Sequence, residues 1–360
     1  MKICIIGDGL VSLTLAKALV NKDICVDVFY NQKHKNHNQT RTLGISKSNI
    51  EYFNSNILNI EKLLWEIKKI IIYTENSSDN EIIKFDDSNK RLFSIIQNHQ
   101  LQNLLAIQLK KNKFFNYKKN IDFKILLKKN YKLIINCESD NLITKKFFSK
   151  KIEKKYDSFA HTTIIEHKKI LPNNVATQIF TNKGPIAFLP ISNTKTSIVY
   201  SIRVGKNKNK IDINNLIKKF NPKYNIKKIY KISSFELKSS NLRRYYSKNI
   251  LAFGDLLHRL HPLAGQGFNM SVRDIKELTE LIENRISLGL DLDSSICIDF
   301  QNRTKDKNYI FSKGIDWIYE LFNFESKINN NILSKSIKLI SMNKSFKKIF
   351  RKFADIGLKN

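Results

Sequence analysis

The residues best suited to chemistry lie between Gly254 and Asp274, where glycines, a proline and polar side chains separate two apolar segments. The run 249–253 predicts a buried strand, and 275–282 predicts a helix. Glycines at such a turn let the backbone come close to a ligand, because a Cβ would block that approach. Backbone N–H groups at the start of the helix can then face an anionic or electron-rich ligand edge. We therefore expect a ligand site here.

Each residue of this stretch also has a simpler interpretation. Gly254 and Gly265 suit a tight turn, and Asp255 suits a helix N-cap. His258 and His261 are three residues apart and could hold a metal ion. No third ligand of a suitable type lies nearby in the sequence, so we rank a metal site low.

A second glycine cluster lies near the N-terminus. Residues 2–6 and 24–30 predict strands, and the stretch from Gly7 opens a helix that we expect to run to about residue 21. In such a strand–helix–strand unit the first glycine, Gly7, makes the tight turn and the second, Gly9, admits a pyrophosphate. Ser12 stands where a third glycine is usual. Alone this pattern is weak evidence, but together with the later glycines it becomes strong.

Two residues of this unit depart from the usual dinucleotide pattern. The acid expected at the end of the second strand, which holds ribose hydroxyls, is replaced by Tyr30. A tyrosine hydroxyl can bond a ribose, but more weakly than a carboxylate. Asp8 places a carboxylate near the expected phosphates, which is unfavourable unless the side chain points away.

Composition narrows the class of protein. The 360 residues suffice for a full core, and no apolar run approaches the roughly 20 residues of a membrane span. The apolar start 3–6 is too short for a signal-peptide core, so we expect a cytoplasmic protein with free thiols at its 4 cysteines. The net charge of +31 is spread along the chain, so we expect no nucleic-acid partner, although an anionic membrane surface would attract the protein.

The remaining pattern is that of a mixed α/β protein. Strands are expected over 67–72 and 81–85, and a helix over 98–109. A hairpin is expected over 121–127 and 131–136. Alternating or apolar segments at 162–166, 176–180, 186–189 and 197–203 predict a mostly antiparallel sheet. Residues 234–237 fit a strand that leads back toward Gly254, and the chain after about 290 has a helical pattern. Apolar and basic residues alternate at helical spacing over 346–356, which suits either packing on the core or a bilayer surface.

The stretch 254–274 resembles the second FAD-binding motif of the flavin-dependent aromatic hydroxylases. It is most similar to the branch that hydroxylates ubiquinone precursors, whose pattern is Gly-Asp-Ala-Ala-His-x-x-His-Pro-x-Ala-Gly-Gln-Gly-x-Asn followed by Arg-Asp. Leu256 and Leu257 replace the two alanines, and the other positions match. Segments 41–46 and 184–190 also resemble family segments. This number of coincident positions favours a flavin site over plain turn chemistry.

The resemblance implies a Rossmann-like FAD-binding domain of the p-hydroxybenzoate hydroxylase type, interleaved with a mostly antiparallel substrate sheet and followed by C-terminal helices. The implied FAD-binding segments are 1–66, 97–155 and 241–300, the substrate segments are 67–96 and 156–240, and the helices occupy 301–360. FAD and NAD(P)H are the implied cofactors, and the reaction is O₂-dependent hydroxylation of a polyprenylated phenol or quinol in ubiquinone biosynthesis. No catalytic side chain is assigned. The implied cofactor-binding residues are Gly7, Gly9, Leu10, Val11, Ser12, Tyr30, Arg41, Gly254, Asp255, Pro262, Gly265, Gln266, Gly267, Phe268 and Asn269.

One departure concerns the reductive half of the reaction. Family members carry Ala-Asp-Gly where this chain has Cys137-Glu138-Ser139. With Tyr30, this favours an alternative in which the protein is a non-catalytic or weakly active scaffold of the same pathway. Other ubiquinone-biosynthesis proteins and, through the basic C-terminal segment, the inner membrane surface are the further partners that the resemblance implies.

Overall fold

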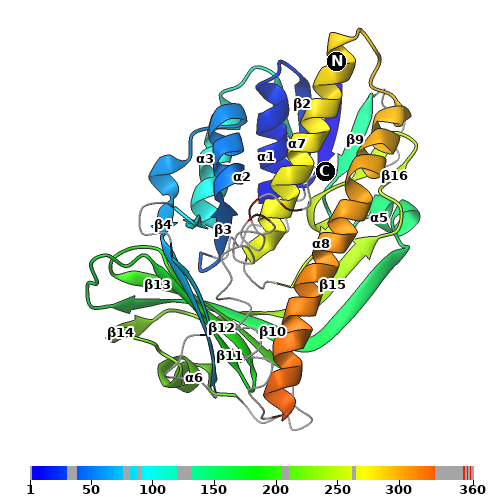
Figure 1. Cartoon of the computed structure of the whole chain (residues 1–360). Helices are drawn as coiled ribbons and strands as arrows, with labels where there is room; N and C mark the ends of the chain where they lie inside the picture. The colour runs from blue at the N-terminus through cyan, green and yellow to red at the C-terminus, as the bar shows by residue number, and fades with distance from the viewer. Residues whose placement is uncertain are drawn as a thin grey trace.

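In the computed structural model, a body of helices around a parallel sheet stands on a body built from an antiparallel sheet (Figure 1). The structure describes residues 2–30, 39–75, 82–86, 91–119, 126, 131–203, 211–261, 265–328, 352, 355 and 357. Among these residues, no helix is long and apolar enough to cross a membrane.

The first body is built on a six-stranded sheet with the order β16-β17-β9-β1-β2-β8. Five strands are parallel, and β16 pairs antiparallel with β17. The central strand β1 is fully buried from Ile3 to Ile6, as expected for a parallel strand covered on both faces. The bounds are β1 Lys2–Ile6, β2 Cys25–Tyr30, β8 Phe115–Lys119, β9 Leu133–Asn136, β16 Tyr246–Ser247 and β17 Ile250–Ala252.

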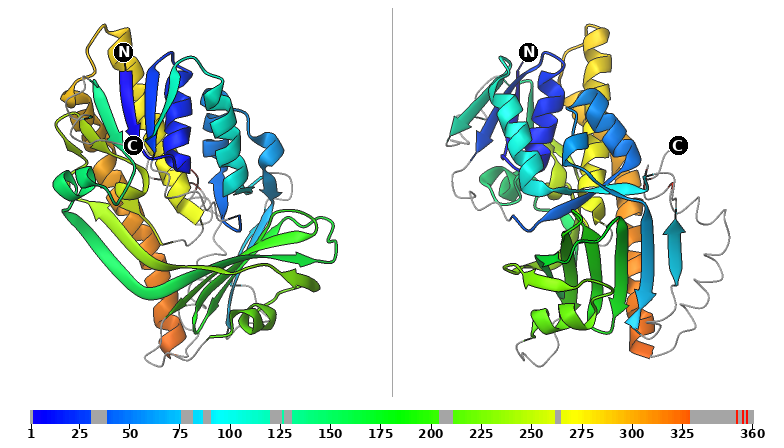
Figure 2. Two further views of the ribbon diagram at one scale, coloured as in Figure 1. Left: turned by 180° about the vertical axis from the view of Figure 1, so that it is seen from behind. Right: turned by 90° about the vertical axis from the view of Figure 1, so that its left-hand side faces the viewer.

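Helices α1, α3 and α7 lie side by side over one face of this sheet (Figures 1 and 2). Short helices connect the other elements of the body. The bounds are α1 Leu10–Val20, α2 Lys47–Asn56, η2 Glu61–Leu63, α3 Asn98–Lys110, α5 Leu142–Phe147, η4 Gly254–Leu256 and α7 Gln266–Ser287.

The second body is a nine-stranded sheet with the order β18-β15-β10-β13-β12-β11-β5-β6, in which β14 also pairs with β10. All its pairs are antiparallel except β11 with β5. The bounds are β5 Lys69–Thr74, β6 Ile83–Asp86, β10 Lys151–His167, β11 Val175–Thr181, β12 Gly184–Pro190, β13 Lys195–Arg203, β14 Ile226–Ile229, β15 Ser233–Leu242 and β18 His258–Arg259, with α6 at Ile213–Lys219.

Three features join the two bodies. A small sheet of β3 Thr42–Ser46, β7 Phe93–Gln97 and β4 Trp65–Ile67 lies between them. The long strands β10 and β15 extend from the antiparallel sheet toward the first body, with a register shift between Lys155 and Phe159. Helix α8, Ser294–Ile328, runs past both bodies and contacts β16 and β17 in one sheet and β11 in the other (Figure 1).

The predicted fold class is confirmed, but one connection is wrong. Strand β9 cannot form a hairpin with 121–127, because its two edges are paired in parallel with β1 and β17. Residues 121–127 lie outside the described residues except for Leu126, as does nearly all of the basic segment 346–356. Strand β8 was not expected, because Phe115–Lys119 carries little apolar alternation. The cysteines are free thiols, two of them buried and two partly buried.

A buried carboxylate ties the edge of the parallel sheet together. The side chain of Asp27, on β2, has no exposed surface, and its Oδ2 accepts hydrogen bonds from Tyr131 Oη and Lys118 Nζ, both at 2.6 Å. Lys2 Nζ lies 3.0 Å from the same oxygen. Burial alone would raise the pKa of Asp27, but the bonds from Lys118, Tyr131 and Lys2 lower it by more.

We expect Asp27→Asn to lower the free energy of unfolding at pH 7 by about 2–3 kcal/mol, because charge-assisted bonds to a buried group are lost. A carboxyl with a depressed pKa stabilises the fold above its unfolded value and loses that contribution as the pH falls through the folded value. The difference in the free energy of unfolding between the wild type and Asp27→Asn should therefore narrow below about pH 4. Urea unfolding at several pH values measures it. Asp291→Asn, at a side chain 80% exposed, is the matched control and should change little. Equal effects of the two substitutions would contradict the role of Asp27.

Candidate active site

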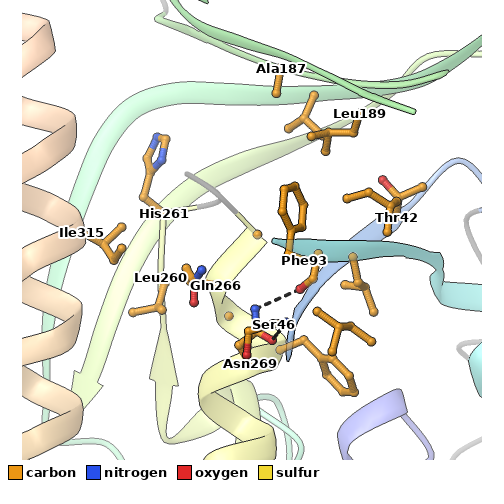
Figure 3. A pocket seen from close by; sticks show the side chains of 18 of the residues that line it. Thr42, Ser46, Phe93, Ala187, Leu189, Leu260, His261, Gln266, Asn269 and Ile315 are labelled. Carbon is orange, nitrogen blue, oxygen red and sulfur yellow. Dashed lines mark hydrogen bonds between the residues drawn. The ribbon is translucent and has the colours of Figure 1, made fainter. Parts of the chain in front are cut away.

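The described residues line a partly open cavity of about 1410 Å³ between the two bodies. One end is formed by glycine-rich turns and helix N-termini, and the other by apolar side chains of the antiparallel sheet and α8. Figure 3 shows the middle of this cavity, with Leu260, His261 and Ile315 on one side and Thr42, Phe93 and Leu189 on the other.

The turn between β1 and α1 opens directly into the cavity. Gly7 has a φ of +110°, which favours glycine, and its N–H donates to the carbonyl of Phe29 at 2.8 Å. Gly9 has ordinary extended angles, and a Cβ built on it would meet no protein atom within 4 Å. Space for a ligand therefore lies beside Gly9. The first backbone N–H groups of α1, from Leu10 to Ser12, follow it and have no acceptor within the helix.

The later glycine stretch packs against this turn. Gly254 has a φ of +63°, and a Cβ built on it would lie 3.1 Å from Val11 Cγ1. Asp255 follows in η4 and lines the cavity with an exposed side chain. The two glycine segments, which are far apart in the sequence, therefore form one end of one cavity.

The start of α7 forms the floor of the cavity. Gly265 caps this helix with a φ of +62°, and a Cβ there would lie 3.2 Å from the backbone nitrogen of Gly44. Asn269 fixes the same contact. Its Oδ1 accepts from the backbone N–H of Ser46 at 3.0 Å (Figure 3) and from Asn49 Nδ2 at 2.9 Å, and its Nδ2 donates to the carbonyl of Gly44 at 2.9 Å.

The structure brings most of the predicted site residues to this end of the cavity. They line it from three segments: Gly7, Gly9, Leu10, Val11 and Ser12; Arg41; and Gly254, Asp255, Gly265, Gln266, Gly267, Phe268 and Asn269. The expected contact of Asn269 with a flavin ring stays a prediction, since its amide atoms bond the protein. Pro262 lies outside the described residues.

Tyr30 does not line the cavity. Its ring packs on that of Tyr117, on β8, with the ring centroids 4.4 Å apart. The hydroxyl of Tyr117 donates in turn to Oδ2 of Asp8 at 3.3 Å. The end of β2 is therefore occupied by an aromatic pair instead of a ribose-binding acid.

The segment that replaces the family's Ala-Asp-Gly lies beside the first glycine. Cys137 and Glu138 line the cavity, and a Cβ built on Gly7 would lie 3.1 Å from Glu138 Cγ. Burial raises the pKa of the Cys137 thiol to about 12, which keeps it protonated near neutral pH.

The two histidines of the glycine stretch do not share a ligand position. His258 Nε2 bonds to the carboxylate of Asp274, whose other oxygen accepts from Asn308 at 2.9 Å. His261 lines the cavity and packs against the rings of Tyr156 and Tyr319. Burial lowers the pKa of His261 to about 3, so this side chain is neutral at pH 7.

The far part of the cavity is mostly apolar. Strands of the antiparallel sheet and helix α8 supply branched and aromatic side chains to it. These are Ile70, Ile72, Ile83, Phe85, Ala176, Phe180, Ala187, Leu189, Val199, Leu237, Phe311, Ile315 and Ile318. A lining of this kind suits the hydrocarbon part of a ligand.

Sequence reasoning missed several residues that shape the site. Ser46 and Asn49 hold α7 through Asn269, and Gln102 Nε2, on α3, donates to the carbonyl of Asp8 at 3.0 Å. These are ordinary polar residues inside regular elements, so no local pattern marks them. Tyr117 lies on a strand that was not predicted.

The residues present fit a dinucleotide cofactor. Open space lies beside Gly9, and the N-termini of α1 and α7 both face the cavity, which favours a pyrophosphate and an electron-rich ring edge. Oε1 of Gln266 is buried, and among the described residues it has no hydrogen-bond partner. A bound ligand with a donor group would satisfy it.

Comparison with solved structures defines the class of fold. The chain is similar to p-nitrophenol 4-monooxygenase from Pseudomonas putida, with a TM-score of 0.79 at 11% identity over 99% of this chain and 98% of that one. It is also similar to Klebsiella pneumoniae HpxO complexed with FAD and uric acid, with a TM-score of 0.73 at 11% identity over 99% and 96%. The fold is therefore that of the flavin-dependent monooxygenases.

Sequence comparison finds relatives over part of the chain. Residues 152–286 match the family model of the FAD binding domain. The chain is 30% identical over 158 residues to the 3-demethoxyubiquinol 3-hydroxylase of Escherichia coli K12, covering 42% of this chain and 40% of that protein. It is 22% identical over 233 residues to the mitochondrial ubiquinone biosynthesis monooxygenase of Danio rerio, covering 53% and 48%. The chain is therefore similar to FAD-dependent hydroxylases, and it spans less than half the length of these two relatives.

We expect the buried His261 to weaken the fold as the pH falls. Its pKa of about 3 lies below the ordinary 6.5, so below pH 6.5 the unfolded chain binds a proton that the folded protein does not. This stabilisation is present above pH 6.5 and lost on acidification, by about 2 kcal/mol between pH 7 and pH 5. His261→Phe keeps a ring in place but cannot bind the proton, so its free energy of unfolding should fall less between pH 7 and pH 5.

Chemical unfolding at pH 7, 6 and 5 measures this difference. The same pair of proteins compared between pH 7 and pH 8 is the control, because the offset between them should be constant there. Parallel losses for the wild type and the variant below pH 6.5 would show that His261 is protonated in the folded state.

Proposed function

We propose that this protein is an FAD-dependent monooxygenase that hydroxylates the ring of a polyprenylated phenol or quinol in ubiquinone biosynthesis, with NAD(P)H as reductant. The observation that carries this proposal is the construction of the cavity. A glycine-rich end faced by two helix N-termini continues into a long apolar chamber. The two ends suit a dinucleotide and a hydrocarbon ligand, respectively.

The residues of the glycine-rich end would hold FAD. Gly7 and Gly9 with the start of α1 would receive the pyrophosphate, and Arg41 would lie near the phosphates or ribose. Asp255 would bond the ribityl chain, and the backbone from Gly265 to Gly267 would pass over the isoalloxazine. When bound and reduced, this cofactor would supply the chemistry that activates O₂ for transfer to an electron-rich ring.

The protein's own contribution would be to position the ring and to exclude water. Apolar side chains from β5, β11 and α8 line the far chamber, so little water would remain around a ligand bound there. The relatives named above are a 3-demethoxyubiquinol 3-hydroxylase and a ubiquinone biosynthesis monooxygenase, and the resemblance to them supports a prenylated substrate. Because such a substrate resides in membranes, and the chain carries a net charge of +31, we propose that the protein works at an anionic membrane surface.

The first experiment is the absorption spectrum of the purified protein, with the released flavin identified after denaturation. We expect about one FAD per chain, followed by NAD(P)H-dependent hydroxylation of prenylated phenols. FAD binding without hydroxylation would favour the scaffold alternative, for which the segment Cys137-Glu138-Ser139 is the supporting observation. Failure to bind FAD even in excess would overturn the proposed enzyme.

We expect Gly9→Val to remove FAD binding without unfolding the protein. Gly9 has extended angles, and its built Cβ meets no protein atom, so a side chain there would fill the cavity instead of disturbing the fold. The dissociation constant should rise at least tenfold, or about 1.4 kcal/mol. Flavin fluorescence titration and thermal unfolding measure the two quantities.

Gly7→Val is the contrasting variant for this experiment. The φ of +110° and the contact with Glu138 predict that it destabilises the fold itself. Unchanged FAD affinity in Gly9→Val would show that the pyrophosphate does not lie beside α1.

A further inference from the structure

The carboxylate of Asp8 lies near the carboxyl end of β2, where this chain lacks the usual ribose-binding acid. Asp8 follows β1, and Tyr117 lies on β8, with β2 between these two strands in the sheet. The bond of 3.3 Å from Tyr117 Oη to Asp8 Oδ2 therefore joins the two side chains across the carboxyl end of β2. The strand register is consistent with this contact. Tyr117 is paired with Val28, two residues before Tyr30, so the side chains of Tyr117 and Tyr30 lie on the same face of the sheet.

The acid is not replaced by the residues that follow β2. Tyr30 packs on Tyr117 outside the cavity lining, and the sequence from Asn31 to Asn38 contains no carboxylate. Asp8, in contrast, lines the cavity between Gly7 and Gly9. Asp8 therefore brings a carboxylate to the cavity near the end of β2.

Both the backbone carbonyl and the side chain of Asp8 accept hydrogen bonds. Gln102 Nε2 donates to its carbonyl at 3.0 Å, and Gln102 is only 8% exposed. The hydroxyl of Tyr117 remains a donor, because burial and the nearby Asp8 raise the pKa of Tyr117. A carboxylate offers about four acceptor positions, so one bond from Tyr117 leaves capacity for the two hydroxyls of a vicinal diol.

We propose that Asp8, held by Tyr117, accepts the vicinal hydroxyls of the adenosine ribose of FAD and so takes over the role of the absent strand-two acid. This inference rests on the proposed function. The opposite expectation is that a carboxylate within the Gly-x-Gly turn only repels the pyrophosphate, in which case its removal would tighten binding. The two interpretations therefore predict effects of opposite sign.

The test is the binding of FAD and of FMN, which lacks the adenosine, to the wild type and to Asp8→Ala. We expect the dissociation constant for FAD to rise about 10- to 100-fold in Asp8→Ala, as for the loss of charge-assisted hydrogen bonds, and that for FMN to stay unchanged. Tyr117→Phe should weaken FAD binding less. Asp291→Ala removes the same charge at a side chain 80% exposed and should leave both constants unchanged.

FAD with a 2′-deoxyribose in its adenosine makes the assignment specific. The wild type should bind it about tenfold more weakly than FAD, and Asp8→Ala should not distinguish the two. Equal or tighter FAD binding by Asp8→Ala, or a parallel loss of FMN binding, would overturn the inference and leave the enzyme proposal intact. A wild type that binds no FAD would overturn both. Thermal unfolding of each variant separates a binding loss from a folding loss.

Discussion

The cavity depends on one constraint, the contact between the start of α7 and the strand β3. Asn269 uses its whole side-chain amide there, bonding Gly44, Ser46 and Asn49. Gly265 permits the approach because a Cβ would press on the backbone of Gly44. These bonds are buried and mutually supporting, so the N-terminus of α7 has one position relative to the small sheet. That position sets the floor on which any ligand of the glycine-rich end would lie.

The two bodies contribute different physical environments to the same cavity. Parallel strands end at one edge of their sheet, so the turns after β1 and β17 meet there and present backbone N–H groups. Antiparallel strands instead present alternate side chains along their length, which gives the far chamber its apolar wall. Helix α8 contacts both sheets, so its apolar face closes the chamber while its packing holds the two bodies together.

Much of this arrangement could be predicted from the sequence, because the decisive signals are local. Strands and glycine turns near residues 2–12 and 250–267 have backbone requirements that few residue types satisfy. The side-chain network around Asn269 could not be predicted, since Asn49 and Gly44 are joined to it only by the fold. The predicted hairpin between 121–127 and 131–136 was wrong for the same reason, because an apolar run does not reveal which strands will pair with it. Tyr30 was assigned to the site by its place at the end of a strand, but its packing against Tyr117 depends on β8, which carries no clear strand pattern.

Charged side chains of both signs line the cavity. Burial keeps His261 and Cys137 uncharged, so these two ionisable side chains do not place a full charge in the cavity near neutral pH. Basic side chains also line the cavity, namely Arg41, Lys47, Arg91, Lys238, Arg259 and Lys352. Carboxylates gather at the glycine-rich end, where Asp8, Glu138 and Asp255 line the wall near two helix N-termini. The positive ends of the helix dipoles offset that charge over about one turn. A ligand with an anionic, hydroxyl-bearing part and a hydrocarbon part would therefore meet matched surroundings at each end, whereas a uniformly charged ligand would not.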